Sequence, residues 1–130
     1  AVVVTLDVKR ALLGKLTVRT RNGTRDTKVS PLDAAREFEA KGAGEILLYS
    51  IDRDGTWSGF DLKVIDSVSR GVGVPVVATG GAGSLQDIKA AVKEAGASAV
   101  AIGSMAVFQG KDLGVLIKFP ARKDQDALFE

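Results

Sequence analysis

The amino-acid sequence predicts an α/β fold that makes up one half of a (β/α)8 TIM barrel, with four β/α units and parallel strands. Short β-branched, apolar runs alternate with segments of helical periodicity, an order typical of a parallel sheet with right-handed crossovers. The chain has 130 residues, half of the ~250 residues of a complete eight-unit barrel. Its 15 glycines cluster where the apolar runs stop. A flat doubly wound sheet is the alternative, but such sheets usually have five or six strands.

The first β/α unit begins with Ala1–Leu6, a short β-branched run that is typical of a fully buried strand. Leu16–Thr20 and the turn sequence RNGT at Arg21–Thr24 predict a small hairpin inserted after that strand. Ser30, followed by a proline and an acidic residue, is typical of a helix start. Lys41-Gly42 predicts the end of this helix.

The other three units repeat this order. Their strands are predicted at Glu45–Tyr49, Val74–Ala78 and Ala99–Ile102, and their helices at Phe60–Ser69, Ser84–Ala95 and, as a short turn, Met105–Gln109. An apolar stretch, Leu113–Phe119, then precedes a proline, after which Ala121–Glu130 is predicted as a final helix. We therefore expect residues 1–130 to form a single half-barrel domain.

Composition excludes several classes of function. The chain has no cysteine and no histidine, so it lacks thiolate metal ligands and the commonest general base, and we expect no metal and no cofactor. The net charge of +2 gives no reason to expect nucleic-acid binding. No apolar run approaches the ~20 residues that span a bilayer. The first apolar run is followed at once by charged residues, unlike a signal peptide. We expect a soluble, cytoplasmic protein without a membrane partner.

Glycines after the last two predicted strands suggest a phosphate site. In a barrel, ligands bind at the carboxyl ends of the strands, and a phosphate site often forms from the final two β/α loops. Gly80 and Gly81 would let backbone N–H groups approach an anion without a side chain in the way. Gly103 and Ser104 open the helical turn after the last strand. A tight strand-to-helix turn would explain either signal alone, but two on successive strands favour a binding site.

Two further strand ends carry acidic side chains. Asp7 ends the first predicted strand, where it is either a general acid–base catalyst or a partner of the neighbouring Lys9 and Arg10. The segment Asp52–Thr56 (DRDGT) follows the second strand. It lacks the later ligand positions of a calcium loop, and an ordinary surface turn does not account for so many polar groups at the functional end.

Four segments together resemble the family of cyclase subunits of imidazole glycerol phosphate synthase. They are VVVTLDVKR (Val2–Arg10), GAGEILLYSIDRDGTWSGFD (Gly42–Asp61), PVVATGGAG (Pro75–Gly83) and AVAIGSM (Ala99–Met105). They cover about residues 1–110 in the family's order, and the SIDRDGT-x-SG stretch is highly specific.

The resemblance implies lyase and cyclase chemistry in histidine biosynthesis. Ammonia from a glutaminase subunit passes through the barrel and attacks a phosphorylated ribulosyl nucleotide intermediate at the mouth, giving imidazole glycerol phosphate and an aminoimidazole carboxamide ribotide. It implies that Asp7 is catalytic and that Ser50, Asp54, Gly55 and Thr56 bind the substrate. It implies that Gly80, Gly81, Gly103 and Ser104 bind phosphate, and that Glu45 lies near the ammonia entrance.

Two departures from the family pattern leave alternatives open. The first half of the family's barrel, with its catalytic aspartate and phosphate site, is not in the sequence. The segment after Gln109 resembles more closely the cyclase-like branch of surface-polysaccharide synthesis, in which ammonia is delivered to a sugar nucleotide to make an amidino group.

A half-barrel exposes two strand edges and one apolar sheet face, which predicts association with another chain. We carry three hypotheses: a piece of the cyclase that needs a complementary half, a homodimer that places two copies of Asp7 across the mouth, and a catalytically inactive phosphate-binding half-barrel that self-assembles.

Overall fold

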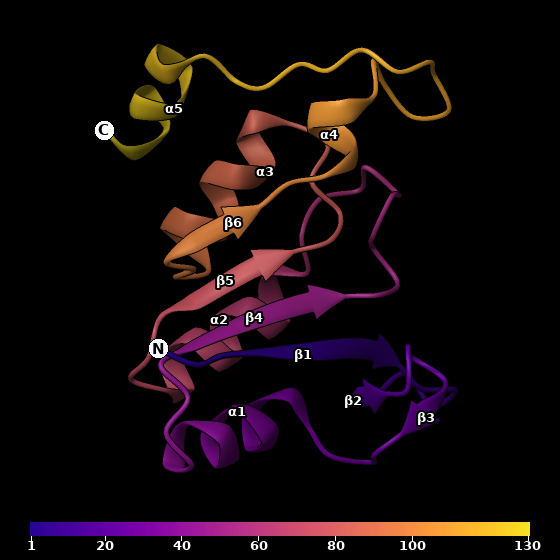
Figure 1. Cartoon of the computed structure of the whole chain (residues 1–130), viewed down its shortest axis with the longest axis vertical. Helices are drawn as coiled ribbons and strands as arrows, with labels where there is room; N and C mark the ends of the chain where they lie inside the picture. Colours follow the sequence, from indigo (N-terminus) through magenta and orange to yellow (C-terminus); the bar gives the residue numbers. More distant parts are fainter.

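The predicted alternation of strands and helices is present in the computed structural model, which describes residues 1–130. Its parallel strands are β1 (Val3–Arg10), β4 (Glu45–Ser50), β5 (Val76–Thr79) and β6 (Ala99–Ala101). They lie side by side in chain order (Figure 1). The hairpin strands β2 (Leu16–Thr20) and β3 (Arg25–Asp26) extend the sheet in antiparallel fashion beyond β1, which gives the order β3-β2-β1-β4-β5-β6. The predicted half-barrel architecture is confirmed.

The helices between the parallel strands cover one face of this sheet, and the other face carries none (Figure 1). They are α1 (Pro31–Ala40), α2 (Leu62–Gly71) and α3 (Leu85–Lys89), which continues as a π-helical turn, η1 (Ala90–Glu94). Side-chain oxygens of Ser30, Asp61 and Ser84 accept hydrogen bonds from backbone N–H groups in the first turns of α1, α2 and α3. The short helix α4 (Ser104–Val107) follows β6, and α5 (Arg122–Phe129) lies near the chain end.

The hydrophobic core lies between the sheet and these helices. Leu6, Val8, Ile46, Leu48, Val76 and Ala78 alternate along the strands and are almost fully buried against the helices. The residues between them point to the other face, where Val3 is 52% exposed. Each fully buried Leu, Ile or Val contributes roughly 1.5–3 kcal/mol. Parallel sheets are normally covered on both faces, so the uncovered face corresponds to the interior of a closed barrel.

Several predicted boundaries were wrong, each for a structural reason. The first strand runs to Arg10 rather than ending at Leu6, because β2 pairs with its second half, from Asp7 to Arg10. Helix α2 begins two residues later than predicted, because Asp61 caps it. The predicted helix Ser84–Ala95 changes to π-helical hydrogen bonding after Lys89.

The apolar stretch Leu113–Phe119 is exposed rather than packed into the core. It runs along the outer side of the molecule beyond β6 (Figure 1), and Ile117 is 81% exposed. One antiparallel bridge, between Phe108 and Val115, connects it to the segment after α4. None of the helices is long and apolar enough to span a bilayer.

Candidate functional site

One row of residues crosses the sheet on its open face, near the carboxyl ends of the parallel strands. The strand registers pair Arg19 with Asp7, Asp7 with Tyr49, Tyr49 with Thr79, and Thr79 with Ala101. Directly paired residues point to the same face of a sheet, and adjacent strands lie about 4.8 Å apart. The neighbours of Asp7 along β1 are buried against the helices, so Asp7 and the whole row face the uncovered side.

The Asp7 carboxylate lies in the middle of this row and makes no hydrogen bond or ion pair within the chain. The cation on the adjacent strand, Arg19, pairs instead with Asp26 at 3.4 Å. Arg10, which could also have paired with Asp7, contacts Asp61 at 3.5 Å. The structure therefore contains no salt-bridge partner for Asp7, and its role as an acid–base catalyst stays a prediction.

Tyr49 belongs to the same row of the candidate site and was not predicted from the sequence. Its hydroxyl donates a hydrogen bond to Asp54 Oδ2 at 3.0 Å. Burial raises the pKa of Tyr49 above its ordinary value of 10.0, and the hydrogen bond to Asp54 and the charges of Asp54 and Asp7 raise it further. The phenol thus stays protonated and acts as a donor. The signal that could have found it is its strand position, in register with Asp7 on the same face.

The loop between β4 and α2 directs only part of its polar groups toward the candidate site. The Thr56 hydroxyl donates to the Arg53 carbonyl at 2.7 Å and contacts the Ser58 hydroxyl, so it holds the loop together. Asp52 accepts the backbone N–H of Arg10 at 2.7 Å. Asp54 and Gly55 reach the pocket described next. The substrate contact by Thr56 stays a prediction, because the Thr56 hydroxyl is bonded within its own loop.

A small cavity of about 170 Å³ brings together six of the predicted site residues at the ends of β5 and β6. Its lining includes Asp54, Gly55, Gly80, Gly81, Gly103 and Ser104, together with Thr79 of the row. Pockets that hold whole drug-sized ligands measure roughly 300–1,000 Å³. The volume therefore suits one compact group, such as a phosphate. We call this cavity the glycine pocket.

The glycines after β5 are required by packing as well as by access to the cavity. A Cβ at Gly80 would lie 2.6 Å from the Ser50 carbonyl oxygen, and one at Gly81 would lie 2.3 Å from the Gly59 carbonyl oxygen. Both glycines also have positive φ angles, of 91° and 109°. We expected them to leave room for an anion. The structure adds that they let the β5 loop cross the β4 loop closely. Gly103, by contrast, faces open space.

Four predicted residues lie outside the glycine pocket: Asp7 and Thr56, described above, and Ser50 and Glu45. The side chain of Ser50 borders a separate cavity of about 10 Å³ beside Phe60 and Asp61. Glu45 is the first residue of β4, pairs with Val3 and lies at the amino end of the sheet. Four residues separate Glu45 from Tyr49, which is roughly 13 Å of strand. The structure therefore places Glu45 away from Asp7, at the amino end of the sheet, and its place near an ammonia entrance stays a prediction. No group of three or more acidic side chains is close enough to hold a metal ion.

Comparison with known proteins identifies similar sequences along most of the chain. The family model described as "Histidine biosynthesis protein" matches residues 1–112. A Pseudomonas aeruginosa protein, provisionally named imidazole glycerol phosphate synthase subunit hisF2, is 46% identical over 120 residues, covering 92% of this chain and 48% of that protein. A Leptospira interrogans protein, provisionally named subunit HisF of the same synthase, is 44% identical over 130 residues, covering 99% and 51%.

The imidazole glycerol phosphate synthase subunit HisF of Alkaliphilus metalliredigens is 47% identical over 105 residues, covering 81% of this chain and 42% of that protein. The chain thus spans about half the length of the curated relatives that it matches.

Proposed function

Since this chain belongs to the histidine biosynthesis protein family, we propose that it forms one half-barrel domain of an imidazole glycerol phosphate synthase cyclase. In this proposal the site binds a phosphorylated ribulosyl substrate and uses ammonia for lyase and cyclase chemistry. The relatives that carry the synthase name support it, since they align with 81–99% of the chain. The half-barrel architecture also supports it, because barrel enzymes bind ligands at the strand ends where Asp7 and the glycine pocket lie.

The observation that carries this proposal is the common row of Asp7, Tyr49 and Thr79. Thr79 borders the glycine pocket, while Asp7 lies two strands away, about 10 Å along the sheet. A phosphate held by the backbone at Gly81 and by Ser104 would leave the sugar chain lying across Tyr49 toward the carboxylate. The glycine pocket therefore anchors the substrate, and Asp7 reaches its reacting end.

Asp7 acts as the general acid–base group in this proposal. The chain has no histidine, and the Asp7 carboxylate has no competing partner. Tyr49 is a positioning residue that holds Asp54 at the edge of the glycine pocket. Glu45, at the amino end of the sheet, lies where ammonia from a glutaminase subunit would enter.

We further propose that a second copy of the chain covers the open sheet face. Val3 and Thr5 on β1, and Ala99 and Ala101 on β6, leave apolar and small side chains exposed on that face. A C2 partner would provide a second Asp7 and a second glycine pocket. A mass in solution of twice the 13.6 kDa of one chain is the expected result. A monomer that doubles only after addition of a different half-barrel would instead show that the partner is a complementary half.

Ammonia-dependent turnover of the ribulosyl intermediate tests the catalytic proposal. Asp7→Asn keeps the size of the side chain but removes its acid–base function, and we expect a loss of roughly 10²–10⁴-fold in turnover with binding retained. Glu94→Gln, which removes an exposed acid on the helical side, is the matched control and should leave turnover unchanged. If wild type and Asp7→Asn bind the substrate equally and neither turns it over, the chain is a phosphate-binding half-barrel without catalysis. Turnover of a sugar nucleotide in the same assay would indicate the amidination reaction instead.

A further inference from the structure

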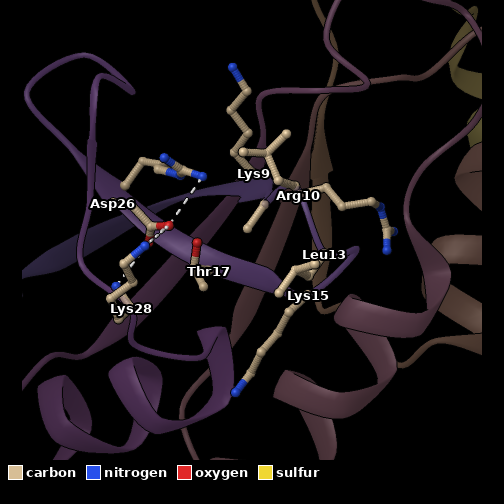
Figure 2. A pocket seen from close by; sticks show the side chains of 10 residues that line it. Lys9, Arg10, Leu13, Lys15, Thr17, Asp26 and Lys28 are labelled. Atoms are coloured by element: carbon tan, nitrogen blue, oxygen red, sulfur yellow. Dashed lines mark hydrogen bonds and ion pairs between the residues drawn. The ribbon is translucent and has the colours of Figure 1, made fainter.

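A second, larger pocket lies on the hairpin side of the sheet (Figure 2). It is an open cavity of about 900 Å³ between β1, β2 and the segment around β3. Five cationic side chains border it, against a single carboxylate, that of Asp26. Nothing in the proposed reaction uses this pocket. We call it the basic pocket.

The inner wall of the basic pocket continues the row that contains Asp7. The register pairs Lys9 with Thr17, Asp7 with Arg19, and Arg19 with Asp26, so all of these side chains lie on the same face of the sheet. The wall therefore begins about one strand spacing, roughly 4.8 Å, from Asp7. The glycine pocket lies on the other side of Asp7, at β5 and β6.

The single carboxylate of the basic pocket already has its partners. Asp26 accepts the backbone N–H of Lys28 at 2.9 Å and contacts Lys28 Nζ at 3.2 Å and Arg19 at 3.4 Å. Figure 2 shows these ion pairs as dashed lines, with the Thr17 side chain next to Asp26. Asp26 thus has little capacity left for the remaining donors of the pocket.

Two buried donors on β2 have no hydrogen-bond partner. They are the hydroxyl of Thr17, a residue only 4% exposed, and Nε of Arg19. The backbone N–H of Lys28 is the main cause that lowers the pKa of Asp26, and the Thr17 hydroxyl lies near enough to contribute. That hydroxyl nevertheless makes no hydrogen bond of normal geometry. Buried polar groups are normally paired, and leaving one unpaired costs free energy. The lining of the basic pocket is therefore rich in donors, and its one carboxylate is already paired.

We propose that the basic pocket binds a phosphate or pyrophosphate group of a small-molecule ligand whose remainder lies toward Asp7. Such a group supplies several acceptor oxygens and negative charge, which complement the five cationic side chains of the pocket. The guanidinium of Arg19 can pair with two phosphate oxygens, and Lys9 and Lys28 add charge at its rim. The pocket is three to four strands from the glycine pocket, roughly 14–19 Å, so one phosphate cannot occupy both. The proposal rests on these donors, whichever reaction takes place at Asp7.

An ordinary solvated basic surface would not show this arrangement. Lys28 is 83% exposed and by itself has no need of a ligand. Arg19 differs, because its side chain is only 14% exposed and is held beside an equally buried Asp26. Arg19 and the buried Thr17 hydroxyl therefore form the base of the basic pocket, and the exposed lysines lie at its rim.

Titration with inorganic phosphate and pyrophosphate, followed by ¹⁵N NMR, tests the proposal. We expect saturable shifts of the Arg19 Nε–H and of the backbone amides of residues 17–19 and 26–28, weakening as salt is added. Arg19→Gln should weaken pyrophosphate binding about tenfold or more, and tenfold corresponds to about 1.4 kcal/mol. Lys28→Gln should weaken binding less, because its ammonium is more exposed. Lys123→Gln, which removes an exposed charge on α5, is the control and should change nothing.

Thr17→Val tests the buried hydroxyl while preserving the shape of the side chain. We expect weaker pyrophosphate binding and only a small loss of stability, because the hydroxyl makes no hydrogen bond of normal geometry and only contributes to the lowered pKa of Asp26. If Arg19→Gln does not fold, Lys9→Gln and Lys28→Gln provide the same comparison from the rim.

Saturable shifts confined to Gly80–Ala82 and Gly103–Ser104, with none in β2 or β3, would overturn this inference and leave the proposed function intact. Shifts in β2 and β3, with none in the glycine pocket, would support the inference and contradict the phosphate anchoring proposed above.

Discussion

The close crossing of the β4 and β5 loops predicts a large loss of stability for Gly81→Ala. The added Cβ would lie 2.3 Å from the Gly59 carbonyl oxygen. That oxygen cannot easily move, because it accepts a hydrogen bond from Arg53 at 3.1 Å, and the Gly59 N–H donates to Gly81 at 2.8 Å. Overpacking costs about 1–3 kcal/mol, a lost hydrogen bond costs about 1 kcal/mol, and the φ of 109° adds about 1–3 kcal/mol of strain.

The expected loss in free energy of unfolding is therefore roughly 3–7 kcal/mol. With an unfolding entropy of about 2.1 cal/mol/K per residue, each kcal/mol lowers the Tm of this chain by about 4 °C. Gly81→Ala should then lower the Tm by roughly 12–28 °C. Thermal unfolding followed by circular dichroism, with urea unfolding as an independent measure, provides the test.

Two other glycines separate the contributions of steric clash and backbone strain. Gly55 has a φ of 71° but no atom near its would-be Cβ, so Gly55→Ala should cost about 1 kcal/mol, or about 4 °C. Gly114 has neither a clash nor a positive φ, and its alanine variant should stay within about 0.5 kcal/mol of wild type. Equal losses for Gly81→Ala and Gly55→Ala would refute the argument, because they would show that the loop crossing yields to a methyl group without cost.

Two titrations test the charged groups of the open face. Tyr49 is the only tyrosine, so phenolate absorbance should report a pKa above 10.0, which Asp54→Asn lowers. Because the pKa is raised in the folded state, protonated Tyr49 contributes its full stabilisation below pH 10.0, and this contribution declines at higher pH. A titration midpoint of Tyr49 at its ordinary value of 10.0 would contradict the contact with Asp54. Carboxyl NMR should report a pKa of about 2 for Asp26. The stabilisation that this lowered pKa provides is complete above pH 3.8 and is lost as the pH falls toward 2. A titration midpoint at pH 3.8 would contradict the contacts of Asp26.

The helix starts could be predicted from the sequence because their signals are local. Ser30 and Ser84 cap α1 and α3 as expected, since a cap needs only a side-chain oxygen within three residues of the N–H that it binds. The end of β1 could not be predicted in this way. Asp7 and Lys9 are polar residues after an apolar run, but pairing with β2 keeps them in the strand. A strand depends on its partner, which here lies beyond a turn of several residues.

Most of the residues that line the candidate site could be predicted from the sequence, but the contacts among their side chains could not. The glycines, Asp54 and Ser104 share one cavity, as expected from strand ends that meet at one edge of a parallel sheet. The contact from Tyr49 to Asp54 was not predicted, nor was the use of the Thr56 hydroxyl inside its own loop. Those contacts depend on loop conformation, which residue types alone do not specify.

The sequence by itself determined the half-barrel and the strand ends at which its polar residues gather, because strand and helix periods, caps and glycine turns are properties of neighbouring residues. Only the tertiary structure decided which side chains face one another across the sheet. The alignment of Arg19, Asp7, Tyr49 and Thr79 is a matter of register between strands far apart in the chain. Register is set by the packing of whole layers, and a shift of one residue would turn Asp7 into the core and leave the basic pocket without its wall.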